Sequence, residues 1–393
     1  MSRSPQLPSA RRCCGCAACH DVCPKSAIRM EPDGEGFLHP RVDPGRCVGC
    51  GLCERSCPVL HDMPERTPMS VRAMQATDGS IRLASSSGGV FSLLAERTLA
   101  SGGIVFGAAF DPSDGAIRHV CATTSEALSP LRGSKYVQSD LSGILAKIRD
   151  ATRSGTFVLF SGTPCQVAAV LRFPGVDRNR LLAVEVICMG VASPSVWRRY
   201  LVLRSEGRNE PVSAASFRDK AFGWKRYSLS LADRNGVFYR KPLSSDPYLR
   251  GMLGRLFLRP SCSRCRFRRL KSGADVTLGD YWNVHRLFPE LDDDKGTSLV
   301  LANTDAGQSA VDALLPLCRA AESDWVRARD VNPALVRSRS NSVGRRLFFR
   351  SVGHGDFEDT VERILRLSRL GGTLRRALRR GKRRLVALVG GPT

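Results

Sequence analysis

The 393-residue sequence lacks any long apolar run, and none approaches the roughly 18 apolar residues that a membrane-spanning helix requires. Its first residues, Met1 to Arg12, are polar and basic, so we expect no secretory signal and a cytoplasmic location. A Gly-x-Gly-x-x-Gly fingerprint is also missing, which argues against a Rossmann nicotinamide site. Lysine is scarce, with nine of the sixty basic residues, so a general preference for arginine contributes to the net charge of +23.

Cysteine, in contrast, is abundant. Fifteen cysteines would indicate disulfides in a secreted chain, but here their spacing indicates metal clusters in a reducing compartment. Two runs share the pattern Cys-x2-Cys-x2-Cys-x3-Cys-Pro, which is typical of bacterial ferredoxins. In such runs the first three thiolates hold one [4Fe–4S] cluster and the fourth ligates the other. We therefore predict two quartets, Cys13, Cys16, Cys19 with Cys57, and Cys47, Cys50, Cys53 with Cys23.

Zinc is the alternative metal that Cys-x2-Cys pairs can bind. It closes its coordination with four ligands and does not need two spaced quartets that each end in Cys-Pro. The spacing therefore favours two [4Fe–4S] clusters, and the rest of the chain is expected to supply or receive electrons.

Beyond the cysteine runs, the pattern of elements alternates between helices and strands. A loop of small residues, Ser85 to Gly89, opens a predicted helix, which suits either an anion site or a plain helix cap. Strands are predicted at 104–110, 156–160 and 181–187. The last two run into turns that carry Cys165 and Cys188, and functional groups at strand ends are typical of α/β proteins.

Four cysteines follow the ferredoxin runs, each beside a turn: Cys165, Cys188, Cys262 and Cys265. Four cysteine thiolates are the ligands that a third [4Fe–4S] cluster would need. Zinc at the same place and simple buried thiols are the alternatives. Cys14, Cys121 and Cys318 fit no constellation.

Eight further segments lie in order along the chain, at 85–91, 133–138, 161–168, 185–190, 217–225, 259–265, 274–282 and 293–304. The most specific are Gly162 to Gln166, Arg218-Asp219-Lys220 with Trp224, and Gly279 to Trp282. Together, over residues 10–350, they resemble the coenzyme F420 hydrogenase/dehydrogenase beta-subunit family. Two departures stand out: Met189 replaces a common histidine, and Asn283 replaces a common glycine.

The resemblance implies FAD beside iron–sulfur clusters, because a flavin can exchange electron pairs with a hydride carrier and single electrons with a cluster. It implies an oxidoreductase that uses a two-electron carrier such as the deazaflavin F420, or a redox partner protein. The expected FAD-binding residues are Ser86, Ser87, Gly88, Gly89, Ser134, Lys135, Tyr136, Gly162 and Thr163. The alternative is an electron-transfer subunit without its own substrate, as in relatives that accompany polysaccharide biosynthesis.

We expect a mixed α+β or α/β fold with four parts. These are a two-cluster ferredoxin domain (1–66), a domain of the family's N-terminal type (67–152), one of its C-terminal type (153–330) and a basic helical tail (331–393).

The tail carries fifteen basic and four acidic side chains, and ten of its cations lie between Arg363 and Arg384. Such a helix suits the inner membrane surface or an acidic protein partner, and a solvated helix is the plainer alternative. Nucleic-acid binding is poorly supported, because no recognised module accompanies the charge.

Overall fold

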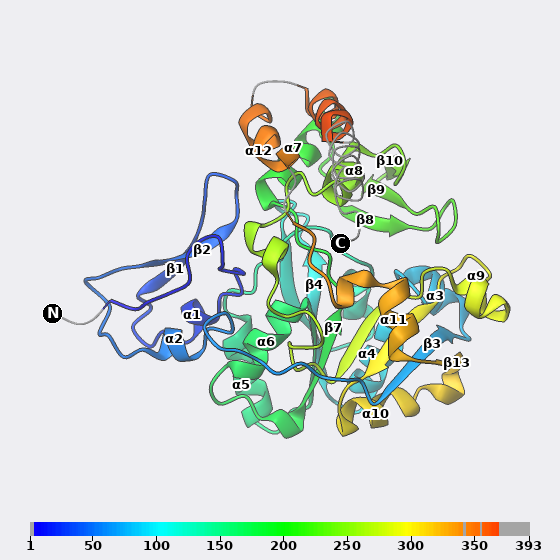
Figure 1. Cartoon of the computed structure of the whole chain (residues 1–393), viewed down its shortest axis with the longest axis horizontal. Coiled ribbons are helices and arrows are strands. Elements are labelled where there is room, and N and C mark those ends of the chain that lie inside the picture. Colours follow the sequence, from blue (N-terminus) through cyan, green and yellow to red (C-terminus); the bar gives the residue numbers. More distant parts are fainter. Residues whose placement is uncertain (1–3, 341–342, 354–355, 369–393) are drawn as a thin grey trace, which may run out of the picture.

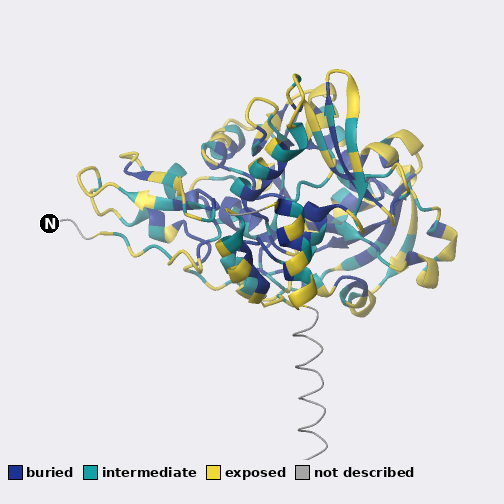
Figure 2. Cartoon of the chain, turned by 90° about the horizontal axis from the view of Figure 1, so that it is seen from above, coloured by how far each residue is buried: buried dark blue, intermediate teal, exposed yellow. Residues whose placement is uncertain are grey.

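The computed structural model describes residues 4–340, 343–353 and 356–368. Its N-terminal module carries a short hairpin, in which β1 (Ile28–Pro32) pairs antiparallel with β2 (Leu38–Val42). Two single-turn helices, α1 (Ala18–Asp21) and α2 (Leu52–Arg55), lie within the two cysteine runs. The module projects from one side of the larger body (Figure 1) and is widely exposed (Figure 2).

The body is built on one sheet of eight strands in the order β13-β3-β12-β11-β7-β6-β4-β5. The strands are β3 (Ser70–Ala76), β4 (Ile104–Phe110), β5 (Ile117–Ala122), β6 (Val158–Gly162), β7 (Leu181–Val186), β11 (Val276–Asp280), β12 (Ser298–Ala302) and β13 (Cys318–Ser323). Neighbours among β4, β6, β7 and β11 run parallel, and the other neighbouring pairs run antiparallel. The mixed sheet confirms the predicted fold class, and it joins strands from before and after residue 152.

Helices cover both faces of this sheet because alternate strand residues are apolar on each side. On one face, α4 (Val90–Ala100) and α10 (Asp305–Asp312) pack on one apolar cluster. On the other face lie α5 (Ile144–Arg153) and α6 (Pro164–Arg172), with α11 (Trp325–Val331) farther along. Two short helices, α3 (Gly79–Ala84) and α9 (Val284–Leu287), lie near the sheet's β3 end (Figure 1).

A second, aromatic core lies above the sheet. It contains a three-stranded antiparallel sheet of β8 (Ala214–Asp219), β9 (Ser228–Asp233) and β10 (Gly236–Pro242). Around it pack α7 (Pro194–Ser205), α8 (Pro247–Leu253), α12 (Val343–Ser351) and the helical residues 357–368. The first part of the segment predicted as a tail therefore contributes to this core, through Phe348, Phe357, Val361 and Ile364.

The ferredoxin module is fixed to the body by buried polar contacts. The Asp21 carboxylate accepts hydrogen bonds from the backbone N–H groups of Gly143 (2.7 Å) and Leu145 (3.0 Å) at the start of α5. Glu35 forms an ion pair with Arg345 of α12, which is itself buried. These contacts join the module to two different layers of the body, so its cysteines have a defined place relative to the sheet.

The packing of α12 generates the first prediction. Phe348 is fully buried, and its ring lies 5.1 Å from that of Phe257 and 6.1 Å from that of Phe357. Phe348→Ala should lower the free energy of unfolding by about 3–5 kcal/mol, because it leaves a cavity in the aromatic core. Leu347, on the same helix, is 39% exposed, and Leu347→Ala should change stability by about 0.5 kcal/mol or less. Anaerobic urea denaturation measures both, and equal losses would show that α12 is not docked through Phe348.

Candidate cluster and cofactor sites

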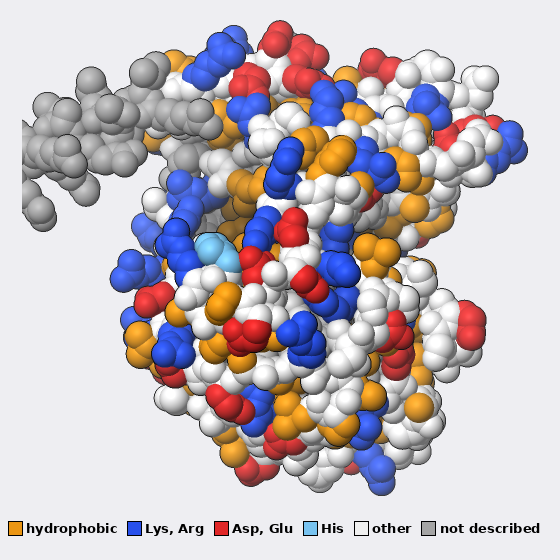
Figure 3. Space-filling view, turned by 90° about the vertical axis from the view of Figure 1, so that its right-hand side faces the viewer, with side chains coloured by type: hydrophobic (Ala, Val, Ile, Leu, Met, Phe, Trp, Pro, Cys, Tyr) orange, Lys and Arg blue, Asp and Glu red, His pale blue; other side chains and the backbone are white. Residues whose placement is uncertain are grey.

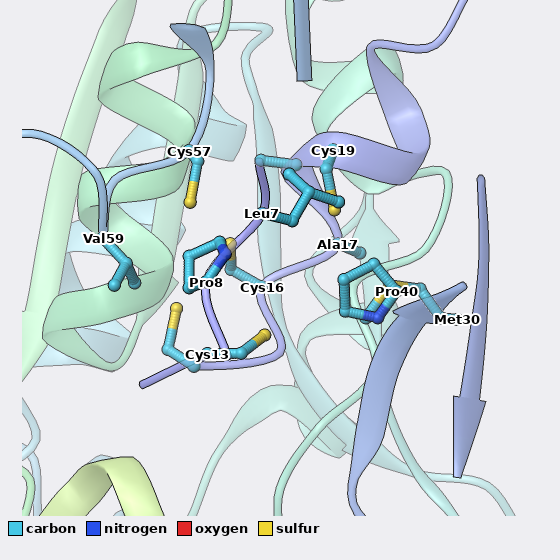
Figure 4. A pocket seen from close by; sticks show the side chains of 12 residues that line it. Leu7, Pro8, Cys13, Cys16, Ala17, Cys19, Met30, Pro40, Cys57 and Val59 are labelled. Carbon is cyan, nitrogen blue, oxygen red and sulfur yellow. The ribbon is translucent and has the colours of Figure 1, made fainter. Parts of the chain in front are cut away.

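The structure brings together the two ferredoxin quartets that the spacing predicts. Cys13, Cys16, Cys19 and Cys57 surround one apolar cavity, whose other walls include Leu7, Pro8, Met30 and Val59 (Figure 4). A second cavity, nearer the surface, is lined by Cys23, Cys47, Cys50 and Cys53. We call these the first and the second ferredoxin quartet. In both, the fourth cysteine comes from the opposite run.

Backbone conformation explains how each run curls around its cavity. Gly15 and Ala17 in the first run, and Gly49 and Gly51 in the second, all adopt left-handed conformations with φ between 60° and 71°. Backbone amides also donate to sulfur, from Gly15 to Cys13 Sγ (3.4 Å) and from Ala27 to Cys23 Sγ (3.3 Å). Such amide–sulfur bonds stabilise the ligated, anionic form of a cluster and help to set its potential.

The four later cysteines also come together, and we call them the inner quartet. Cys165 lies in the first turn of α6, Cys188 follows β7, and Cys262 and Cys265 lie at and just beyond a 3₁₀ turn, Pro260–Arg264. Gly190 has a φ of +126°, which L side chains rarely adopt, and a Cβ there would come within 2.9 Å of Leu258 Cδ1 and 3.2 Å of Cys262 Cβ, so glycine suits the place where the Cys188 turn approaches the Cys262 turn. Four partly buried thiols from three separate stretches of the chain thus lie close together.

Electrostatics supports this grouping. Burial, with a contribution from the neighbouring thiolates Cys165 and Cys265, raises the pKa of Cys188 to about 12. Burial and the other three cysteines likewise raise the pKa of Cys262. A thiol whose pKa is raised in this way binds a metal centre only by losing its proton, so metal binding at these four cysteines would be coupled to proton release. The Arg268 guanidinium, which donates to the Cys188 carbonyl, offsets part of this cost.

A cluster and a single metal ion differ in the spacing that they require of four thiolates. Among the residues that the structure describes, no three His, Cys, Asp or Glu side chains form a group that could hold one metal ion. A tetrahedral zinc site places four sulfurs about 2.3 Å from one atom, whereas four irons spread the thiolates farther apart.

A cleft of about 1560 Å³, including its open mouth, lies where β6, β7 and β11 end. The carboxyl ends of parallel strands are the usual ligand-binding edge of such a sheet. All but one of the residues predicted to bind FAD line this central cleft. They are Ser86, Ser87, Gly89, Ser134, Lys135, Tyr136, Gly162 and Thr163.

Gly88, the exception, packs beneath the loop. A Cβ on Gly88 would come within 2.2 Å of the Met74 carbonyl oxygen, so its glycine is explained by contact between loop and sheet. Its N–H donates to Ser298 Oγ at 2.9 Å.

Hydrogen bonds order the loops of the cleft. Ser86 Oγ and Ser134 Oγ are 2.9 Å apart and join the two predicted flavin loops. Lys135 Nζ donates to three carbonyls of its own loop, those of Pro130, Arg132 and Gly133. Burial lowers the pKa of Lys135 to about 7, so its charge depends on what occupies the cleft.

One wall of the cleft holds a buried ion pair among aromatic rings. Arg218 donates to both carboxylate oxygens of Asp280, at 2.9 and 3.0 Å. Its guanidinium lies 4.0 Å from the Tyr227 ring centroid and 5.3 Å from that of Trp282. Trp224 stacks on Trp282 and donates from Nε1 to Asp280 Oδ1. The motifs that carry the family resemblance thus build one wall of the cleft, although the sequence analysis assigned these residues no place in the site.

A histidine that sequence reasoning missed also lines the cleft. His119 of β5 is 4% exposed and stacks on Phe160, and its Nε2 lies 3.0 Å from the Ser161 carbonyl oxygen. Burial, assisted by nearby Lys135, lowers the pKa of His119 to about 4. Met189, which stands where relatives commonly have histidine, lines the same cleft and is 51% exposed. No local sequence signal marks His119, because only the sheet brings it here.

The cleft, the inner quartet and the first ferredoxin quartet are contiguous. Cys188 belongs to the inner quartet and also lines the cleft. On the other side, Cys165 and Cys265 pack in one apolar cluster with Cys57 of the first ferredoxin quartet. Cys14, which fitted no constellation in the sequence, lies in this cluster and hydrogen-bonds through its thiol to Cys165.

The buried His119 predicts a pH dependence of stability. The pKa of His119 in the folded protein, about 4, lies below the ordinary value of 6.5. The contribution of this group to the free energy of unfolding is therefore fully present above pH 6.5 and is lost as the pH falls toward 4. Between pH 7 and pH 5 the loss from this group should be about 2 kcal/mol. His119→Phe should remove that part of the loss, and exposed His285→Phe should not. Urea denaturation at both pH values measures the difference, and an unchanged pH dependence in His119→Phe would refute this assignment.

Comparison with protein-family models gives three matches. Residues 12–60 match a 4Fe-4S dicluster domain. Residues 71–146 match the N-terminal part, and residues 156–319 the C-terminal part, of the coenzyme F420 hydrogenase/dehydrogenase beta subunit.

Among solved structures, a chain of the F420-reducing [NiFe] hydrogenase complex from Methanosarcina barkeri, studied by xenon derivatization, is similar at 18% identity and a TM-score of 0.48. The match covers 70% of this chain and 91% of that chain. None of the curated proteins compared with the chain matches it. The two beta-subunit matches together cover more than half of the sequence, and the chain therefore belongs to the coenzyme F420 hydrogenase/dehydrogenase beta-subunit family of oxidoreductase subunits, with a 4Fe-4S dicluster domain ahead of the family region.

Proposed function

We propose that the chain is a flavin-dependent oxidoreductase that passes electrons between a two-electron carrier and its ferredoxin clusters. FAD would occupy the central cleft, and a third [4Fe–4S] cluster would be held by the inner quartet. When bound, FAD supplies the exchange between electron pairs and single electrons. The observation that carries the proposal is that Cys188 both lines the cleft and belongs to the inner quartet.

The cleft offers a place for each end of the cofactor. Gly89, Val90 and Phe91 line it at the start of α4, an eleven-residue helix whose first backbone amides suit a phosphate. Lys135, with its lowered pKa, would become fully charged beside an anionic phosphate or a reduced ring. Tyr227, Trp282 and the Arg218–Asp280 ion pair would present a flat wall to a ring system.

The same arrangement supports a path along which electrons could move in either direction. The inner quartet contacts the cleft on one side and the first ferredoxin quartet on the other. The second ferredoxin quartet, with exposed Cys50, lies at the surface, where a redox partner protein would exchange electrons. F420 or a similar hydride carrier is the substrate class that we propose for the cleft.

The basic segment between Arg363 and Arg384 falls mostly on residues outside the described part of the chain. Its docking to an anionic membrane or an acidic protein therefore stays a prediction. Within the described residues, no helix combines the length and apolar character needed to cross a bilayer. On the face shown in Figure 3, basic and acidic side chains are interspersed, without a single continuous patch of one sign.

Iron content tests the third cluster. The intact chain should contain about twelve irons, four for each cluster. The double exchange Cys262→Ser with Cys265→Ser should lower this to about eight and leave the ferredoxin signals intact. Cys121→Ser with Cys318→Ser is the matched control, because these cysteines lie on the edge strands β5 and β13, and it should keep all the iron. An unchanged iron count after the first exchange would exclude the third cluster.

Flavin content tests the cleft. Anaerobically purified protein should release FAD on denaturation. Ser134→Trp should reduce the bound FAD at least about tenfold, because the indole would fill the cleft where Ser134 meets Ser86. Ser154→Trp places the same side chain on the exposed end of α5 and should keep the flavin.

Either of two outcomes would contradict the flavin assignment. One is a flavin-free protein that cannot be reconstituted although its clusters are complete. The other is full flavin in Ser134→Trp. A flavin-loaded protein that is reduced only through its clusters, and never by a hydride carrier, would instead favour the electron-transfer subunit without its own substrate.

A further inference from the structure

Arg259 is fully buried, with 0% of its surface exposed. It lies where the ferredoxin module meets the body. Its guanidinium donates to the Cys13 carbonyl (2.8 Å), to Gln138 Oε1 (2.7 Å) and to the Leu38 carbonyl (2.9 Å). Its remaining polar contact is with the His39 ring, at 3.2 and 3.3 Å. All of these partners are neutral groups.

The absence of a counter-charge is the unusual feature. In the described part of the chain, no carboxylate lies within ion-pair distance of Arg259. The nearby carboxylate of Asp33 contacts His39 and not Arg259: its Oδ2 lies 3.1 Å from His39 Nε2. A buried charge without a partner costs several kcal/mol, so native proteins pair such charges or place them beside a bound ion. Arg218 and Arg345, which are also buried, both have carboxylate partners.

The position of Arg259 indicates what supplies the missing charge. The backbone of Gly15, inside the first ferredoxin run, packs directly on its guanidinium, and a Cβ on Gly15 would come within 2.7 Å of Nη1. Arg259 also precedes the inner-quartet turn, and its carbonyl accepts the N–H of Cys262 at 3.1 Å.

We propose that Arg259 is a positioning residue and the built-in counter-charge of the cluster held by the first ferredoxin quartet. Four thiolates make a ligated cluster anionic, and reduction adds one more negative charge. A fixed cation in a low-dielectric joint favours the reduced form and raises the potential. The same side chain ties the loop of the first ferredoxin run to the turn that carries Cys262.

This inference rests on the dicluster domain, not on FAD or the inner quartet. Loss of the proposed flavin or of the third cluster would leave it intact. It also assigns a function to Gln138, which holds Arg259 through Oε1 and the Gly15 carbonyl through Nε2 (3.3 Å).

The test is an EPR-monitored redox titration of the anaerobic holoprotein. The EPR signal altered by Cys50→Ala belongs to the cluster of the second ferredoxin quartet, which we call the outer cluster. The remaining ferredoxin signal belongs to the cluster of the first ferredoxin quartet. Arg259→Gln should make reduction of that cluster at least tenfold less favourable, which corresponds to about 59 mV more negative for one electron. The outer cluster should not shift.

Three further variants separate charge from structure. Arg259→Lys keeps the charge and should keep most of the potential, although it loses the fork of hydrogen bonds. Gln138→Glu places a carboxylate against Arg259 Nη1, so it should lower the potential in the same direction while the guanidinium stays in place. Arg345→Gln removes a buried arginine at the same joint that is already paired with Glu35, and it should leave the potential unchanged.

The outcomes decide between a counter-charge and a purely structural arginine. If Arg259→Gln does not fold, Gln138→Glu carries the test alone. Potentials in Gln138→Glu, and in any folded Arg259→Gln, that equal the value of Arg345→Gln would overturn the proposal.

Discussion

The burial of cysteine thiols is the constraint on which the rest of this structure depends. A thiol in apolar surroundings holds its proton, and burial together with its neighbours raises the pKa of Cys188 to about 12. Such a group can act as a ligand only where several thiolates share a strongly positive centre and fixed cations lie near. The turns around the inner quartet bring Gly190 and the cation Arg268 close to these thiols.

The same constraint accounts for the docking of the ferredoxin module. A module on a free linker would not hold its first quartet beside Cys165. Asp21 at the start of α5 and Glu35 on Arg345 fix the module at two points. Between them, Cys57, Cys165 and Cys265 pack in one apolar cluster, so module and body meet at their cysteines.

The sequence predicted what depends on local spacing. The ferredoxin spacing defined both quartets, and strand–turn patterns placed Cys165 and Cys188 at strand ends. The loops at 85–89 and 133–136 were predicted as partners, and the structure joins them through Ser86 and Ser134. The fold class was predicted correctly for the same reason, because alternation of helices and strands is a local signal.

What the sequence could not show depends on tertiary contacts. His119 reaches the cleft because β5 pairs with β4, and Arg259 reaches Cys13 across most of the chain length. The spacing of residues in the sequence predicts neither contact. The segment after residue 330 was predicted from its charge as a tail, yet Phe348 and Phe357 are core residues, because burial of their aromatic side chains favours packing against the body.

The central claim is that the inner quartet holds a cluster between the cleft and the ferredoxin module. Diffraction from anaerobic crystals at the iron absorption edge tests it most directly. The account predicts three iron peaks, at the first ferredoxin quartet, at the second, and among Cys165, Cys188, Cys262 and Cys265. Two strong peaks in the ferredoxin module, with none among those four cysteines, would contradict it.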